Sequence, residues 1–275
     1  MKINKFKILV ILFISVLFIT SCKEDEIVAV DDATTESIQK SAEIDVVSDN
    51  VSSIVEEVFI AEEGLATHSK TNPFFPECMT KTVDINGFTR TVTLDFGEGC
   101  EMYNGNYLSG ILTMEYVRDP IAMTRTIIYT FTNFFFNYKS IEGGGSIVRE
   151  RINEYGNPQS TKNQDITLTW PDGKSAHRVG VKIREWTEGF GSGTWGDNVF
   201  LITGNWSTDF SNGDVNTGLV TTPLRRELAC RFIVSGVIAL THNDNAGTLD
   251  FGDGSCDNEA IFIDSNGVEH IIVLK

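Results

Sequence analysis

The sequence has few of the residues and motifs that build metal, nucleotide or nucleophile sites. Its four histidines are scattered and form no His-Glu-x-x-His pair or other zinc spacing. Its five cysteines include no Cys-x-x-Cys pair, which disfavours a zinc site, and none has a recognisable histidine partner for thiol catalysis. Ser192 lies one position too late for a Gly-x-Ser-x-Gly nucleophile elbow, and residues 143–145 are glycines without the lysine of a phosphate loop. The sequence therefore points away from the enzyme classes that these motifs serve.

Basic residues are also scarce, with 22 lysines and arginines against 38 acidic residues and a formal charge of −16. A field of this sign repels nucleic acid and anionic lipid head groups, so no nucleic-acid partner is expected. Cations, basic proteins and neutral ligands are easier partners. Solubility of an exposed protein is the simpler explanation of the charge.

The N-terminus has the pattern of a bacterial lipoprotein signal. Three lysines precede an apolar run over residues 8–19 that contains one polar residue, Ser15, and the run is too short to span a bilayer comfortably but suits a signal-peptide core. The run ends in Ile19-Thr20-Ser21-Cys22, which resembles a lipobox, where a signal peptidase cuts before a lipid-modified cysteine. We expect residues 1–21 to be the signal peptide and Cys22 to carry diacylglycerol and an acyl chain such as palmitate. An ordinary secretory signal or a short transmembrane anchor is the alternative.

The residues after Cys22 indicate how the protein is displayed. Lys23-Glu24-Asp25-Glu26 resembles the surface-export signal of Bacteroidota lipoproteins, which implies an outer-membrane protein anchored by lipid and exposed at the cell surface. Residues 22–40 are polar and acidic without a periodic apolar pattern, so we expect a flexible tether. Removal of residues 1–21 takes away three lysines and no acid, which moves the formal charge from −16 to −19. The acyl chains would supply the membrane affinity.

The other four cysteines are expected to form two disulfides, because disulfides persist outside the cytoplasm. Three pairings are possible. The favoured one joins Cys78 to Cys100 and Cys230 to Cys256, because the residues between each pair have the pattern of two strands and a turn that return the chain to its start. Each unstrained bridge would stabilise the fold by roughly 3 to 4 kcal/mol.

Residues 41–64 have the pattern of one amphipathic helix. Six apolar residues recur at helical spacing: Ile44, Val47, Val51, Ile54, Val55 and Val58. A valine-rich stripe has weak helix propensity, so the helix is expected to need a sheet to pack on. A helix that binds a partner is the functional alternative.

Residues 73–275 are predicted to form an antiparallel β domain, either a sandwich or a strongly curved sheet. Alternating apolar residues indicate strands with one buried face, as in the set Phe88, Val92, Leu94 and Phe96 and the set Leu108, Leu112, Met114 and Tyr116. Turns are indicated at Asn86-Gly87, Asn104-Gly105, Asp172-Gly173, Asn212-Gly213 and Asn266-Gly267. The last strand, over residues 268–274, is nearly all apolar, so we expect it inside the sheet and expect its truncation to be destructive.

Two similar acidic turns, over residues 93–100 and 248–256, share the sequence Thr-Leu-Asp-Phe-Gly followed by an acid and a glycine. Carboxylates around glycines suit calcium, and the candidate ligands in the second turn are Asp250, Asp253 and Asp257. Their spacing differs from an EF-hand loop, however, and Asp-Gly clusters are common turn formers. We therefore expect both turns to be architectural, each closing a disulfide-pinned hairpin.

One tryptophan is a candidate for ligand binding. Trp195 lies in the glycine-rich segment Gly193-Thr194-Trp195-Gly196-Asp197, where an exposed indole could stack on a sugar ring. The alternative, that tryptophans fill the core, is preferred for the other three.

Taken together, the lipobox, the acidic export-like segment and the paired Asp-Phe-Gly turns resemble an uncharacterised β-rich lipoprotein family of Bacteroidota. The resemblance implies no activity, and no catalytic residue and no cofactor is assigned. The preferred hypothesis is a non-enzymatic binding or structural protein at the cell surface with a glycan or protein partner. The alternatives are a polysaccharide hydrolase with paired carboxylates and a periplasm-facing accessory or carrier protein.

Overall fold

A computed structural model of the chain describes residues 32–63, 76–102, 105–192, 194–230 and 232–274. The predicted signal peptide and Cys22 lie outside these residues. The described residues contain one long α-helix, α1 (Asp32–Glu62), and a short 3-10 helix, η1 (Trp195–Asp197). The strands are β1 (Thr80–Asn86), β2 (Thr89–Asp95), β3 (Cys100–Glu101), β4 (Tyr107–Val117), β5 (Thr124–Phe136), β6 (Lys139–Glu150), β7 (Gln159–Thr169), β8 (Ser175–Glu188), β9 (Val199–Phe210), β10 (Val215–Glu227), β11 (Ile233–His242), β12 (Asn245–Asp253), β13 (Glu259–Ile263) and β14 (Glu269–Val273).

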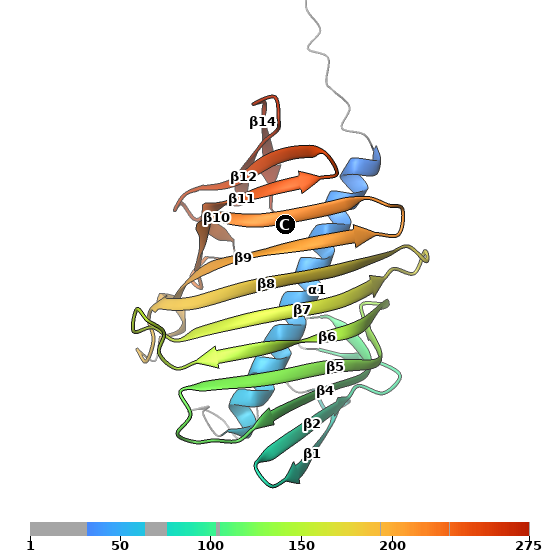
Figure 1. The fold of residues 1–275 in the computed structure, drawn as a ribbon, viewed down its shortest axis with the longest axis vertical. Coiled ribbons are helices and arrows are strands. Elements are labelled where there is room, and N and C mark those ends of the chain that lie inside the picture. Colours follow the sequence, from blue (N-terminus) through green and yellow to red (C-terminus); the bar gives the residue numbers. More distant parts are fainter. Residues whose placement is uncertain (1–31, 64–75, 103–104, 193, 231, 275) are drawn as a thin grey trace, which may run out of the picture.

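All the described strands belong to one antiparallel sheet in which neighbours in sequence are neighbours in space. The order runs from β1 to β14, and the short strand β3 pairs with β4 outside this path. Figure 1 shows a single twisted layer that is crossed on one face by α1. The predicted all-β class with one N-terminal helix is confirmed, and the sheet is one continuous layer with two open edges, not a two-sheet sandwich.

The predicted glycine turns account for much of this topology. Gly87, Gly173, Gly213 and Gly267 all have positive φ and connect consecutive antiparallel strands. A tight connection of this kind matches the twist of the flanking strands and brings the chain straight back along itself. The repeated hairpins therefore produce a meander without crossovers.

Helix α1 packs its apolar stripe on the sheet, as the spacing predicted. All six predicted stripe residues are buried, and Phe59 extends the stripe by another turn. Complete burial of each such side chain contributes about 1.5 to 3 kcal/mol, which compensates for the weak helix propensity of valine. The same core includes Leu94, Leu112 and Met114 from the sheet. No helix within the described ranges is long and apolar enough to cross a membrane.

The boundaries of α1 differ from those expected. The helix begins at Asp32 and ends at Glu62, so residues 32–40, which were expected to belong to the flexible tether, form its first turns. Helix formation is cooperative, so a polar segment without an apolar stripe can still be helical when it continues a helix that packs on the sheet. The predicted end near Gly64 lies just outside the described residues.

Two predictions of burial are wrong. Phe88 lies in the turn between β1 and β2 and is 77% exposed, because the hairpin reverses before the alternating pattern of β2 begins. The terminal strand β14 forms, but it lies at the edge of the sheet with all five residues exposed. An apolar run indicates a strand without showing what covers its faces.

Both favoured disulfides are present. Cys78 is bonded to Cys100 and Cys230 to Cys256, across 22 and 26 residues. The first bridge joins the segment before β1 to the first residue of β3, and the second joins the segments that flank β11 and β12. Each bridge therefore closes a two-stranded hairpin near one end of the sheet, as predicted.

Candidate functional site

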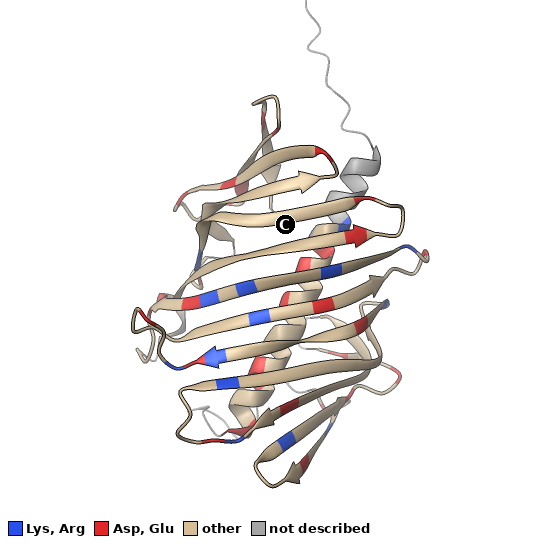
Figure 2. Ribbon diagram, viewed as in Figure 1, with Lys and Arg blue, Asp and Glu red and all other residues tan. Residues whose placement is uncertain are grey.

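The largest polar feature of the described chain lies between α1 and the middle of the sheet. Asp45 and Asp49 are one helical turn apart, so they share a face of α1. Arg178 and Lys182 lie four positions apart in β8, so they share a face of that strand. Figure 2 shows basic residues on β7 and β8 and acidic residues on α1, which passes behind these strands. We call this set of charges the helix–sheet ion cluster, formed by Asp45, Asp49, Lys162, Arg178 and Lys182.

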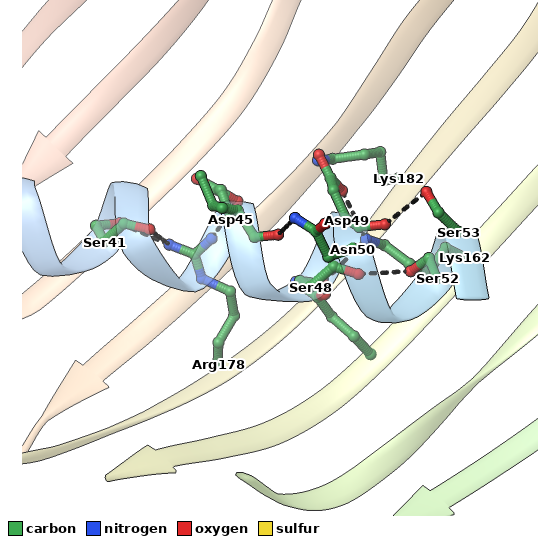
Figure 3. Close-up of polar contacts among 12 residues, drawn as sticks. Ser41, Asp45, Ser48, Asp49, Asn50, Ser52, Ser53, Lys162, Arg178 and Lys182 are labelled. Carbon is green, nitrogen blue, oxygen red and sulfur yellow. Dashed lines mark hydrogen bonds and ion pairs between the residues drawn. The ribbon is translucent and has the colours of Figure 1, made fainter. Parts of the chain in front are cut away.

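Arg178 is completely buried, and each of its three guanidinium nitrogens has a polar partner. Its Nε donates to Thr208 Oγ1 at 2.8 Å, and Nη2 donates to Ser41 Oγ at 2.6 Å. Nη1 pairs with the carboxylate of Asp45 (Figure 3). Burial lowers the pKa of Arg178, and the Asp45 carboxylate opposes that shift. An arginine stays protonated in proteins, so the buried charge needs these partners.

Asp49 lies between two lysines that face each other across β7 and β8. Lys162 and Lys182 are directly opposite in the strand register. The Lys182 ammonium lies 2.8 and 2.9 Å from the two Asp49 oxygens, and Lys162 Nζ lies 3.0 Å from Oδ1 (Figure 3). Burial alone would raise the pKa of Asp49, but the two ammonium groups outweigh burial and lower it well below its usual range. Asp49 thus stays ionised and offsets the repulsion between two like charges.

This arrangement suits attachment of the helix better than acid–base chemistry. A carboxylate with a strongly lowered pKa holds no proton near neutral pH and is a weak base, so Asp49 is unsuited to either role of a catalytic pair. The contact of α1 with the sheet is also tight. The gap beneath the helix leaves no room for a water molecule and is lined by Val47, Ser48, Val51, Tyr129, Phe131, Ile141 and Ile166.

Two adjacent glutamates on the same helix have a different environment. Burial and the neighbouring Glu56 raise the pKa of Glu57, and Arg149 opposes this shift. Arg149 Nη1 lies 3.9 Å from Glu56 Oε2, a distance that permits an ion pair but no hydrogen bond. A carboxyl group with a raised pKa beside a second carboxyl group is one feature of the acid and base pair of a hydrolase.

The structure places some of the predicted site residues and not others. Cys22 lies outside the described residues, and Trp195 begins η1, although its side chain also lies outside what is described. The three calcium candidates act as turn formers. Asp250 accepts a hydrogen bond from the backbone N–H of Gly252, Asp253 from that of Ser255, and Asp257 from that of Glu259. No group of three metal-ligating residues occurs anywhere in the described part of the chain.

Sequence reasoning missed the helix–sheet ion cluster because β8 has its pattern reversed. Its apolar residues alternate with basic ones, a pattern that normally places the apolar residues inside. In the structure Arg178 is buried and Val179 is 48% exposed. A usable signal was present in the sequence. Two acidic residues, Asp45 and Asp49, lie four positions apart in α1, and two basic residues of opposite charge, Arg178 and Lys182, lie four positions apart in β8.

Comparisons with known proteins give no relative. No protein-family model, no curated protein and no solved structure matches the chain.

Proposed function

We propose that this protein is a lipid-anchored lipoprotein of the outer membrane with a non-enzymatic binding role at the cell surface. The observation that carries this proposal is the way in which α1 is attached to the sheet. Its apolar stripe is buried and its acidic residues are ion-paired to the sheet, so α1 covers the part of the face that it crosses, and the gap beneath Val47, Ser48 and Val51 has no room for a ligand. A glycan or protein partner can then bind to the accessible surfaces, which include the broad face of the sheet opposite α1.

Anchoring is tested by replacing the predicted lipid attachment residue, Cys22. We expect the full-length protein to incorporate labelled palmitate and to fractionate with the outer membrane, and Cys22→Ala to lose both properties. Cys78→Ala, combined with Cys100→Ala, is the matched control, because it removes cysteines that form a disulfide. Protease treatment of intact cells then tests display, and complete protection of the wild-type protein would favour the periplasm-facing carrier instead.

The binding role is tested with a glycan array and a reducing-sugar assay on the same preparation. Retention of a glycan without release of reducing ends supports binding, whereas turnover supports the hydrolase.

The hydrolase alternative has one observation in its favour, the raised pKa of Glu57 beside Glu56. If these residues act as a carboxylate pair, Glu57→Gln abolishes turnover and leaves glycan retention intact. Asp165→Asn is a suitable control, because this carboxylate is 75% exposed on the opposite face of the sheet.

A further inference from the structure

Three arginines lie close together on the helix-bearing face, toward one end of the strands. Arg149 of β6 is opposite Ser160 of β7, which is opposite Arg184 of β8, so the two arginines occupy one cross-strand row. Arg226 of β10 is opposite Phe200 of β9, and the Arg184 guanidinium lies 3.7 Å from the centre of the Phe200 ring. We call these residues the arginine cluster, formed by Arg149, Arg184 and Arg226.

Within the described ranges, the carboxylate within ion-pair distance of the arginine cluster is that of Glu56, beside Arg149. Among the described residues Arg184 has no ion pair, and its buried Nε has no hydrogen-bond acceptor. Arg149 Nη1 is also buried without a hydrogen bond, with Glu56 at 3.9 Å. Arg226 is held by backbone carbonyls, including that of Phe232 at 2.8 Å.

Such an arrangement is costly for the folded protein alone. Burial lowers the pKa of Arg184, and the carboxylates of Glu56 and Asp49 oppose that shift. Burial also lowers the pKa of Arg226, and the neighbouring Arg184 lowers it further. A buried donor without an acceptor also costs free energy. In a chain with a formal charge of −16, three neighbouring arginines with one ion-paired carboxylate indicate a binding site for an anion.

Aromatic side chains continue this surface. Phe200 lies beneath Arg184, and the Trp186 ring centre is 5.4 Å from that of Phe200. Phe190 packs edge-on against Trp186 at 5.0 Å and is 65% exposed. Aromatic faces that are partly exposed beside hydrogen-bond donors are well suited to the C–H face of a sugar ring.

We propose that the arginine cluster and the adjacent aromatic residues bind an oligosaccharide that carries carboxylate or sulfate groups. The planar guanidinium groups of Arg149 and Arg184 bind the oxyanions in a bidentate manner, and Trp186 and Phe190 contact the sugar rings. This inference rests on the proposed binding role and specifies its ligand. The acidic field of the remaining surface disfavours long, densely charged polyanions such as nucleic acid.

The test is calorimetric titration of the full chain in detergent micelles with four probes. The probes are oligogalacturonate, a chondroitin sulfate oligosaccharide, the neutral sugar maltohexaose and inorganic sulfate. We expect at least one of the two acidic oligosaccharides to bind, and the two probes together distinguish carboxylate from sulfate recognition. Binding should weaken as salt is raised, because the ion pairs that form are partly screened.

Variants then assign the binding to these residues. Arg149→Gln and Arg184→Gln should each lower the affinity about tenfold or more, the effect of losing a charge-assisted contact. Arg225→Gln is the matched control, since it removes the same charge from the neighbouring position of β10, where Arg225 is paired with Glu188 and Glu227. It should change the affinity less than about twofold. Trp186→Leu should weaken oligosaccharide binding but leave any sulfate binding unchanged.

The outcomes separate this inference from the proposed function. Wild-type affinity in Arg184→Gln that melts normally, or failure of both acidic oligosaccharides to bind, overturns the inference. If Arg184→Gln does not fold, Arg184→Lys keeps the charge but loses the planar fork, and unchanged affinity in that variant has the same meaning. Equal dependence of sulfate and oligosaccharide on Trp186 overturns the sugar contact. Tight binding of maltohexaose that ignores both arginines leaves the binding role standing and refutes the acidic ligand.

Discussion

At the scale of single residues, the most informative feature is the inside-out arrangement of β8. Arg178 is buried although arginine is costly to remove from water, and it is accommodated because Asp45, Thr208 and Ser41 take up its donors. The strand thus exchanges an apolar contact for an ion pair with α1. Such an exchange fixes the position of the helix along the sheet, because the guanidinium can meet its partners in one geometry only.

Loss of Asp45 should therefore destabilise the whole domain. Asp45→Ala leaves Arg178 buried without its counter-charge, and we expect unfolding to become easier by about 2 to 3 kcal/mol, toward the lower end for a broken buried pair because the Asp45 side chain is 34% exposed. Chemical denaturation monitored by circular dichroism measures this. Asp165→Asn, on the open face of the sheet, should cost less than about 0.5 kcal/mol. A stability of Asp45→Ala equal to that of the control would show that the pair does not hold the helix.

At the scale of elements, local signals in the sequence were reliable and long-range ones were not. The apolar stripe of α1, the Asn-Gly and Asp-Gly hairpins and the two disulfides depend on residues close in the chain, and the structure has them where they were predicted. The burial of β14 and the reversed pattern of β8 depend on what lies against each face. Only the folded arrangement decides that. The arginine cluster was missed for the same reason, because its members are contributed by β6, β8 and β10.

The edge position of β14 changes the expectation for a C-terminal truncation. Removal of residues 268–275 deletes a strand whose five residues are all exposed and leaves β13 as the new edge. The backbone groups thus freed can be hydrated, so the expected loss is less than about 2 kcal/mol, and the protein should still unfold cooperatively. Leu112→Ala, in the core, should cost about 2 to 5 kcal/mol and calibrates the measurement. Insoluble or molten truncated protein would instead show that β14 stabilises the sheet.

At the scale of the whole molecule, one helix is held on a single-layer sheet by charges of opposite sign on the two elements. A further pair joins Glu43 of α1 to Lys139 at 3.2 Å, and Glu63, which directly follows the last residue of α1, lies 2.9 Å from Arg125. The lysines and arginines of the sheet keep their charge in acid, whereas the carboxylates of the helix lose theirs. Acid therefore leaves cations on the sheet facing a neutral helix, so the integrity of the fold depends on pH.

The sign of this dependence follows from Asp49. Its pKa in the folded protein lies below the ordinary value of 3.8, because Lys182 and Lys162 outweigh the effect of burial. A lowered folded-state pKa contributes stability that is fully present above the unfolded-state pKa and is lost as the pH falls through the folded-state value. The Asp49 side chain is 54% exposed, so solvent screening reduces the size of this contribution but not its sign.

We therefore expect Asp49→Asn to be less stable than wild type at neutral pH and to approach it as the pH is lowered below about 4. Denaturation curves at a series of pH values measure the difference, and hydrogen exchange of the α1 amides shows whether acid loosens the helix before the sheet. Asp165→Asn should differ little from wild type at either pH, since Asp165 is 75% exposed on the opposite face. A difference between Asp49→Asn and wild type that stays constant from neutral to acid pH would mean that Asp49 stabilises α1 by packing. In that case the ion pairs with Lys162 and Lys182 would not be the interaction that holds the helix on the sheet.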